Sequence, residues 1–468
     1  MKDPTTMSDD VLAFLAKDKT NAIGRLRRFL SIPTVSTDPA FESHVRRGAK
    51  WVADTLEEIG LEATVQETGG HPVVVGKSTD SDASTPHVLF YGHYDVQPPD
   101  PLDKWTSPPF APEIRDNAIV ARGASDDKGQ VSCFLEALRA WKQVHGRIPV
   151  PVTVLIEGEE ECGSENLADF VRRNKAQLKG PGEGVVVISD TTMWETPTES
   201  RVAITYGLRG MLYYDVQLHG PQRDLHSGMY GGTLANPATM LARVLGGLLD
   251  ERHHVTIPHF YDDVVSPTDD ERRRWSRLNF NEKAFLAEVG VDAGFGEDGF
   301  DVLSRRWARP TCDLNGLYGG YGGDGAKTVI PSFAGAKVSF RLAPDQRPDR
   351  LAAQFEEWIR SHEIPGCRWE LTCHGQADPV LVPTDSPHVS AAGQAVKACA
   401  GHEPVLVREG ATIPIVADFK NTLGMDSLLI GFARRNDCIH APNEKFDLAC
   451  FELGCRTHAV LLREMAKG

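Results

Sequence analysis

Residues 152–164 read VTVLIEGEEECGS, an apolar run that ends at a glycine and three consecutive glutamates. The same order, an apolar run followed by a turn with acids or imidazoles, recurs in HVLFYGHYDVQ (87–97) and in VVVISDT (185–191). Short apolar runs bounded by turn residues are typical of buried strands. The carboxyl ends of parallel strands lie along one edge of an open α/β sheet. We therefore expect these polar side chains to converge at such an edge.

Strand-like and helix-like segments alternate in the first part of the chain. Helical apolar spacing occurs at 9–30, 41–60 and 130–144. The strand-like runs are 72–76, 87–91, 118–121, 152–156 and 185–188. Strands that alternate with helices predict βαβ units and a largely parallel sheet.

The pattern changes after about residue 205. Segments 211–220, 336–344 and 368–375 alternate like half-buried antiparallel strands, and helix-like stretches lie at 237–250, 281–289 and 349–361. A helix (388–400), a strand (426–432) and a long helix (446–466) then restore the α/β pattern. We predict an α/β domain formed by 1–206 and 381–468, with a mainly parallel sheet flanked by helices. An α+β domain, 207–380, interrupts it, as expected for a chain of 468 residues.

The composition excludes some partners. The formal charge of −15 argues against nucleic acid or an anionic membrane as the main partner. No uninterrupted apolar run is long enough to cross a bilayer, and the first 20 residues lack a signal-peptide stretch. The nine cysteines include no C-x-x-C pair, and we expect them to be reduced thiols. We therefore expect a cytoplasmic protein.

Five residues in these turns form a candidate metal-binding set. Imidazoles and carboxylates together suit borderline divalent metals. The set is His93, Asp126, Glu161, Asp190 and His440. Each alone is more typical of a structural or surface position, but their shared place after strand-like runs favours a divalent-metal hydrolase. A carboxylate such as Asp126 can bridge two cations, and Asp95 could hold the second ring nitrogen of His93.

The run Glu159–Glu161 has two interpretations. Adjacent carboxylates repel one another unless they are solvated or held by cations. An exposed acidic turn is the plain alternative. In the functional interpretation one glutamate binds metal while its neighbour accepts a proton.

A glycine-rich segment, NGLYGGYGGDGAKT (315–328), resembles a phosphate-binding loop only superficially. Ala326 stands where a glycine should precede the lysine, and VIP follows where a helix should begin. We predict a flexible lid loop near the substrate.

The motifs also resemble a known family. GHYDVQPP, RGASDDKG, EGEEECGS, ISD and DCIHAPNE are similar to those of the di-zinc metallopeptidases that include acetylornithine deacetylase, succinyl-diaminopimelate desuccinylase and glutamate carboxypeptidase. The carnosine and cytosolic nonspecific dipeptidase branch is the nearer match. YGLRG (206–210), DLHSG (224–228), KTVIP (327–331), SFRLAPDQ (339–346) and REGATIPI (408–415) extend the likeness. It runs from about residue 20 to the C-terminus.

This resemblance implies two divalent ions per subunit, with zinc favoured and manganese and cobalt as alternatives. His93 and Asp190 would bind one ion, Glu161 and His440 the other, and Asp126 would bridge them. Glu160 would be the general base and Asp95 would orient His93. The peptide bond between Asp126 and Asp127 is expected to be cis.

The inserted domain has its own implied roles. It would act as a lid and form a homodimer in which His226 enters the active site of the partner subunit. Arg341, Thr328 and Thr412 fall at positions that contact substrate in the family, although Thr412 replaces a serine. Arg341 is a planar cation suited to a substrate carboxylate.

The predicted function is hydrolysis of the amide bond of small peptides by a metal-dependent dipeptidase. In this mechanism two metals activate a water and a glutamate acts as base. An N-acyl-amino-acid deacylase of the same family is one alternative. A metal-dependent binding protein without catalysis is another, against which the intact Glu160 and Glu161 argue.

Overall fold

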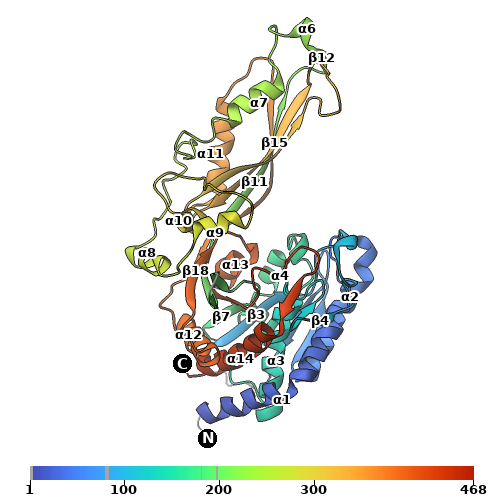
Figure 1. Ribbon diagram of the computed structural model, residues 1–468, viewed down its shortest axis with the longest axis vertical. Coiled ribbons are helices and arrows are strands. Elements are labelled where there is room, and N and C mark those ends of the chain that lie inside the picture. Colours follow the sequence, from blue (N-terminus) through green and yellow to red (C-terminus); the bar gives the residue numbers. More distant parts are fainter. Residues whose placement is uncertain (1–3, 80–83, 181, 197–198, 468) are drawn as a thin grey trace. The chain divides into compact units, whose positions relative to one another are not determined.

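The chain forms two compact units, described separately below (Figure 1). The computed structural model describes residues 4–79, 84–180, 182–196 and 199–467. Unit 1 comprises 1–206, 382–407 and 418–468, and unit 2 comprises 207–381 and 408–417. The predicted fold class, a mainly parallel α/β sheet interrupted by an α+β region, is confirmed by the elements of the two units.

Unit 1 is built on a sheet whose inner strands are parallel. The strand order is β1-β2-β6-β3-β7-β19-β10. The bounds are β1 Glu62–Gln66, β2 Val73–Lys77, β6 Val152–Glu157, β3 His87–His93, β7 Gly184–Ile188, β19 Asp426–Gly431 and β10 Ala203–Leu208. The pairs β3–β6, β3–β7 and β7–β19 are parallel, whereas β1, β2 and β10 pair antiparallel. Strand β18 (Val405–Glu409) adds to β10. His93 ends the parallel strand β3, and Glu161, Asp190 and His440 come after the parallel strands β6, β7 and β19.

Strand β3 shows why its residues form a central strand. All seven of its residues are buried. Successive side chains of a strand point to opposite faces of the sheet. Phe90 stacks on Phe134 of helix α3 (Lys128–His145) with ring centroids 4.0 Å apart, while the ring centroid of Tyr91 lies 5.4 Å from that of Phe419. Both faces are therefore covered, which explains the continuous apolar run in the sequence.

Helices of unit 1 surround this sheet (Figure 1). They are α1 Pro4–Leu30, α2 Glu42–Ile59, α3 Lys128–His145, α4 Leu167–Arg173, α5 Lys175–Lys179, α12 Pro387–Ala400 and α14 Leu448–Met465. Helix α14 packs on α1, α3 and α12, and α2 packs on β1 and β2. Helix α3 ends at Gly146, which adopts the left-handed conformation with φ 72° that favours glycine at a helix C-cap.

The strand predicted at 118–121 is confirmed as β5 (Ala118–Val120), but it does not join the largely parallel main sheet. It lies in a separate antiparallel sheet of order β20-β5-β4. The other strands are β4 Glu113–Arg115 and β20 Lys445–Asp447. Asp116 and Asn117 have φ of 47° and 60°, the left-handed pair that closes a two-residue hairpin between β4 and β5. Strand β5 therefore pairs with β4 on one side and β20 on the other.

Unit 2 contains a four-stranded antiparallel sheet of order β13-β15-β11-β16. The strands are β13 Thr311–Gly319, β15 Phe333–Leu342, β11 Gly210–His219 and β16 Arg368–Ala377. Alternate residues of β11 are buried, and Leu212, Tyr214 and Val216 share a core with residues of helices α7 (Pro237–Leu245) and α11 (Pro348–Ser361). The helices are α6 Ser227–Tyr230, α7 Pro237–Leu245, α8 Asp269–Ser276, α9 Glu282–Ala287, α10 Val302–Trp307, α11 Pro348–Ser361 and α13 Pro414–Asp418. One sheet face is thus apolar and the other polar.

The glycine-rich segment differs from its prediction. Residues 315–319 are not part of a loop but belong to the edge strand β13, which pairs with β15. The short strands β12 (Leu225–His226) and β14 (Val329–Ile330) pair with each other beyond it. The repeated glycines suggested a loop for the whole segment 315–328. Pairing with β15 instead gives residues 315–319 a strand conformation.

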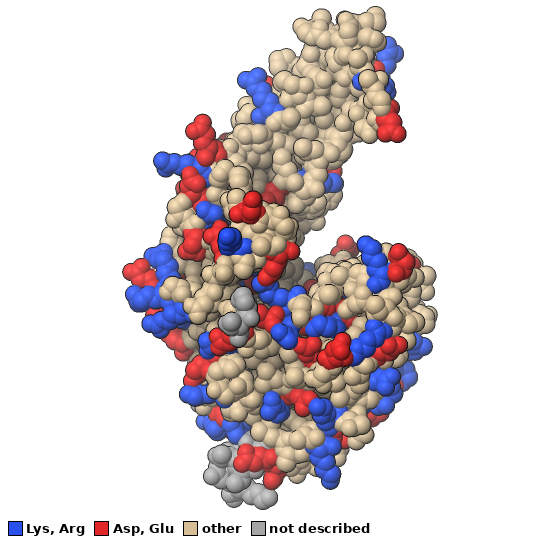
Figure 2. All heavy atoms as spheres, in the orientation of Figure 1, with Lys and Arg blue, Asp and Glu red and all other residues tan. Residues whose placement is uncertain are grey.

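The surface carries both signs of charge. Figure 2 shows lysine and arginine side chains interspersed with aspartate and glutamate on the visible face. Among the described residues, no helix is both long and apolar enough to cross a membrane.

Candidate active site

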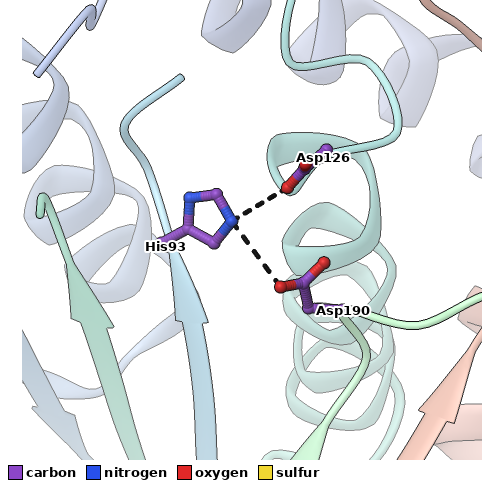
Figure 3. Close-up of side chains that lie close together, drawn as sticks. All are labelled: His93, Asp126 and Asp190. Carbon is purple, nitrogen blue, oxygen red and sulfur yellow. Dashed lines mark hydrogen bonds and ion pairs between the residues drawn. The ribbon is translucent and has the colours of Figure 1, made fainter. Parts of the chain in front are cut away.

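The candidate residues of unit 1 converge at the carboxyl ends of its parallel strands, as the sequence predicted. His93 is the last residue of β3, Asp190 follows β7, and Glu160 and Glu161 follow β6. Asp126 immediately precedes the turn into α3, and His440 lies between β19 and β20. In Figure 3 the side chains of His93, Asp126 and Asp190 point toward one another.

One group of potential ligands, the His93 triad, consists of His93, Asp126 and Asp190. His93 Nε2 lies 3.0 Å from Asp126 Oδ1 and 3.8 Å from Asp190 Oδ2 (Figure 3). One ligand atom from each residue lies within 4.8 Å of the other two. Such spacing suits a small divalent cation bound by nitrogen and oxygen.

A second group, the His440 triad, consists of Asp126, Glu161 and His440. His440 Nε2 lies 2.9 Å from Asp126 Oδ2 and 3.2 Å from Glu161 Oε2. The two triads share Asp126, and each of its carboxylate oxygens faces a different histidine. This arrangement is what a carboxylate that bridges two cations requires.

The turn that presents Asp126 depends on a close backbone approach. The Asp126–Asp127 peptide bond is cis. A Cβ atom at Gly129, in the first turn of α3, would lie 1.9 Å from the carbonyl oxygen of Ala124. Only glycine allows the turn to fold back over the helix start in this way.

The residue predicted to orient His93 contacts it directly. Asp95 Oδ1 lies 3.3 Å from His93 Nδ1, the ring nitrogen that faces away from Asp126. The other Asp95 oxygen accepts a hydrogen bond from the backbone N–H of Glu161 at 3.0 Å. Asp95 therefore links one member of each triad, which suits a residue that fixes ligand orientation.

Two supporting residues were missed by the sequence interpretation. Gln97 donates from Nε2 to Glu161 Oε2 at 2.9 Å, and its backbone N–H donates to Glu161 Oε1 at 3.2 Å. The buried Asp127 accepts a hydrogen bond from the backbone N–H of His93 at 3.3 Å. Gln97 lies in the motif GHYDVQPP and Asp127 in RGASDDKG. A polar side chain close in sequence to a candidate ligand was the only feature that could have predicted these supporting roles.

The site concentrates negative charge in a buried place. Burial raises the pKa of Glu160 to about 9, with Asp190 and Asp126 adding to the rise against the effect of His93. Burial together with Asp126 raises the pKa of Asp190 to about 7. Hydrogen bonds to Asp126 and Glu161 raise the pKa of His440 to about 10. Burial and the neighbouring carboxylates disfavour the ionised acids, and a divalent ion would offset their mutual repulsion. The donor set therefore fits the implied metals.

The remaining candidates lie in unit 2 and form two pairs. Arg341 on β15 donates to Thr412 Oγ1 at 2.8 Å, and Thr412 donates to the carbonyl oxygen of Arg209 at 2.6 Å. The carbonyl oxygen of Thr328 accepts a hydrogen bond from the backbone N–H of Ser227, the residue after His226. The structure thus brings Arg341 to Thr412, and Thr328 to the His226 turn.

His226 is the exposed last residue of β12. Strand β12 lies beside α6 at one end of unit 2 (Figure 1). His226 Nδ1 accepts a hydrogen bond from the backbone N–H of Gly228 at 3.0 Å. In a neutral imidazole the proton then resides on Nε2, which is left as a hydrogen-bond donor.

Comparison with known proteins decides the family. The model of peptidase family M20/M25/M40 matches residues 89–464. The chain belongs to this family. The matched range contains every residue assigned above to the His93 and His440 triads.

Two curated relatives of this M20 chain are dipeptidases by name. The Cys-Gly metallodipeptidase DUG1 of Candida albicans is 33% identical, over 94% of this chain and 93% of its own length. The human Beta-Ala-His dipeptidase is 28% identical, over 99% of this chain and 94% of its own length. The resemblance to the carnosine and cytosolic dipeptidase branch is therefore confirmed.

A solved structure shows the same architecture. The M20 family metallo-carboxypeptidase Sso-CP2 from Sulfolobus solfataricus has a TM-score of 0.84 and 30% identity. The match covers 96% of this chain and 99% of that chain.

Proposed function

We propose that the chain is a metal-dependent dipeptidase with two divalent ions at the His93 and His440 triads. The observation that carries this proposal is the pair of triads sharing Asp126, with Glu160 beside them. The names of the two dipeptidase relatives support the reaction class. Zinc is the favoured metal, because histidine and carboxylate ligands in small groups suit it.

The residues of the site divide the chemical work. When bound, divalent ions at such a site lower the pKa of water and polarise a carbonyl group. Glu160 takes the proton of the attacking water, holds it on its carboxyl group and passes it to the leaving amine. Its burial beside other carboxylates favours holding that proton. Asp95 keeps the ring of His93 in place throughout.

Arg341, Thr412 and Thr328 are proposed to bind the substrate. The Arg341 guanidinium is half-buried, and burial lowers its pKa. Its hydrogen bond to Thr412 is to a neutral hydroxyl, and the charge of Asp313 acts against the effect of burial on its pKa. A partly buried guanidinium is suited to binding a substrate carboxylate. Thr328 would contact substrate beside His226.

A homodimer through unit 2 is part of the proposal. Strand β13 is an edge of its sheet, and an unpaired edge is a ready surface for another chain. Leu314 and Leu317 on β13 are 44% and 64% exposed, and Met229 near His226 is 73% exposed. In the dimer, His226 would donate from Nε2 to the developing oxyanion in the partner's active site.

Subunit mixing tests the role of His226 in the partner. His226→Ala and Glu160→Gln variants are each expected to be nearly inactive. In a mixed dimer, one site would carry both lesions and the other neither, so activity should reappear on subunit exchange. The measurement is turnover after mixing, with heterodimers verified by differently tagged subunits. Heterodimers that stay inactive would show that His226 does not serve the neighbouring site.

Substrate comparison tests the function itself. The purified chain loaded with Zn²⁺, Mn²⁺ or Co²⁺ should hydrolyse Cys-Gly or β-Ala-His, and a chelator should reduce hydrolysis to background. Readdition of the metal should restore it. The comparison substrates are an N-acetylated amino acid and an N-blocked tripeptide. Each contains an amide bond that can be cleaved, but neither has the free amino group of a dipeptide.

Each other outcome points to a different reading. Faster cleavage of the N-acetylated amino acid would establish the deacylase alternative. Faster release of the C-terminal residue from the blocked tripeptide would establish a carboxypeptidase. Metal binding without hydrolysis of any of these substrates would favour the binding protein.

A cytoplasmic location is also proposed, supported by nine cysteines that are all free thiols.

A further inference from the structure

A buried glutamate outside both triads connects two ligand-bearing loops. The first, the Asp126 loop, is residues 122–127. The second, the His440 loop, is residues 437–444. Glu444, at the end of the His440 loop, is completely buried, although glutamate is almost never fully buried unless it is paired.

The carboxylate of Glu444 accepts four hydrogen bonds from the Asp126 loop. Oε2 accepts from Arg122 Nη1 and from the backbone N–H of Gly123, both at 2.8 Å. Oε1 accepts from the backbone N–H groups of Ser125 at 2.9 Å and Asp126 at 3.0 Å. Three backbone N–H groups of one turn and one guanidinium group thus donate to a single carboxylate. Charge-assisted hydrogen bonds of this kind are the strong ones.

A second contact joins the same two loops. Ser125 donates from Oγ to Asp437 Oδ2 at 3.0 Å. Just before the Asp126 loop, the backbone N–H of Ala121 donates to the carbonyl oxygen of Glu444 at 3.0 Å. Within the His440 loop, His440 itself has φ of 60°, which non-glycine residues rarely adopt. The loop therefore needs external contacts to hold His440 where it lies.

The two triads depend differently on these contacts. In the His93 triad, His93 ends β3 and Asp190 follows β7, so neighbouring strands of the sheet set two of the three ligands. In the His440 triad, Asp126 and His440 both stand on the loops that Glu444 joins. We propose that Glu444 is a positioning residue that sets the Asp126 loop against the His440 loop and thereby controls ion affinity at the His440 triad.

Glu444→Gln is the test variant. It keeps the size of the side chain but replaces one oxygen with an NH₂ group, which would face two N–H donors in either orientation. Changes in residues that support metal ligands typically cost about 10–100-fold in affinity. We expect this loss at the His440 triad and a change of less than about threefold at the His93 triad. Calorimetric titration of the metal-free protein with Zn²⁺ against a competing chelator measures both affinities.

Glu136→Gln is the matched control. Glu136 is also a buried glutamate of unit 1, and it accepts hydrogen bonds from Arg25 at 2.7 and 2.6 Å, outside both triads. This variant should lose stability in urea unfolding but keep both Zn²⁺ affinities. Placing Glu444→Gln in Asp190→Ala and His440→Ala backgrounds identifies the triad that is weakened.

The outcomes separate this inference from the function on which it rests. A wild-type chain that binds fewer than two ions would reject the two-ion centre itself. A wild-type chain with two ions and a Glu444→Gln variant with unchanged affinities, or with both weakened equally, would reject only the role of Glu444. If that variant does not fold, Arg122→Gln tests the proposal instead, because it removes the guanidinium that donates to Glu444. Its selective weakening of the His440 triad is expected, and unchanged affinity would overturn the proposal.

Discussion

Glu160→Gln is expected to lower kcat by roughly 10²–10⁴-fold, the usual contribution of a positioned acid–base group. The amide is nearly the same size but cannot accept the proton of the attacking water. Glu160 belongs to neither triad, so both ions should remain bound. The measurement is kcat at saturating dipeptide, together with the metal content of the same preparation.

The neighbouring Glu159 provides the control for this change. It is buried, and its Oε1 accepts a hydrogen bond from the backbone N–H of His71 at 2.9 Å, so its contacts are structural. Glu159→Gln should reduce kcat by less than tenfold. A metal-loaded Glu160→Gln protein with near-normal kcat would remove Glu160 from the role of base. An equal loss in both variants would point to the shape of the turn rather than to proton transfer.

Asp126→Ala is expected to abolish binding of two ions and to remove activity to background. Each oxygen of Asp126 faces a different histidine, at 3.0 Å for His93 and 2.9 Å for His440. Its loss therefore deprives both triads of a ligand and removes the carboxylate that His93 and His440 share. Elemental analysis after dialysis measures the number of ions per chain.

Asp190→Ala is the comparison, since Asp190 belongs to the His93 triad alone. It should retain one tightly bound ion and lose the other. Circular dichroism of both metal-free variants checks that the fold persists. Two tightly bound ions in the Asp126→Ala protein would contradict the bridging role.

The sequence predicted most of the site because its residues follow strands directly. His93 ends β3, Glu160 and Glu161 follow β6, and Asp190 follows β7. For such residues the strand pattern alone indicates the edge of the sheet. Gln97 stood in a quoted motif, yet its hydrogen bonds to Glu161 depend on a contact between segments that the sequence does not pair.

Two differences from the structure share a physical cause. The apolar run 118–121 and the glycine-rich start of 315–328 were interpreted from local composition. Strand β5 instead joins β4 and β20, and residues 315–319 join the edge of another sheet. Whether a short segment pairs, and with which strand, is decided by packing and by turn geometry such as that of Asp116 and Asn117.

By itself the sequence determined the kinds of chemistry available: acids and imidazoles after buried strands, a basic side chain at 341, and an inserted domain of different pattern. Only the tertiary structure decided which groups meet. Ser125 and Glu444 are 319 positions apart, yet they are joined by a 2.9 Å hydrogen bond that helps to hold Asp126. The pattern of apolar and polar residues along the chain predicts where a strand ends, because this pattern is local in sequence. Contacts between loops arise only after the sheet brings their ends together, so they cannot be read from local pattern.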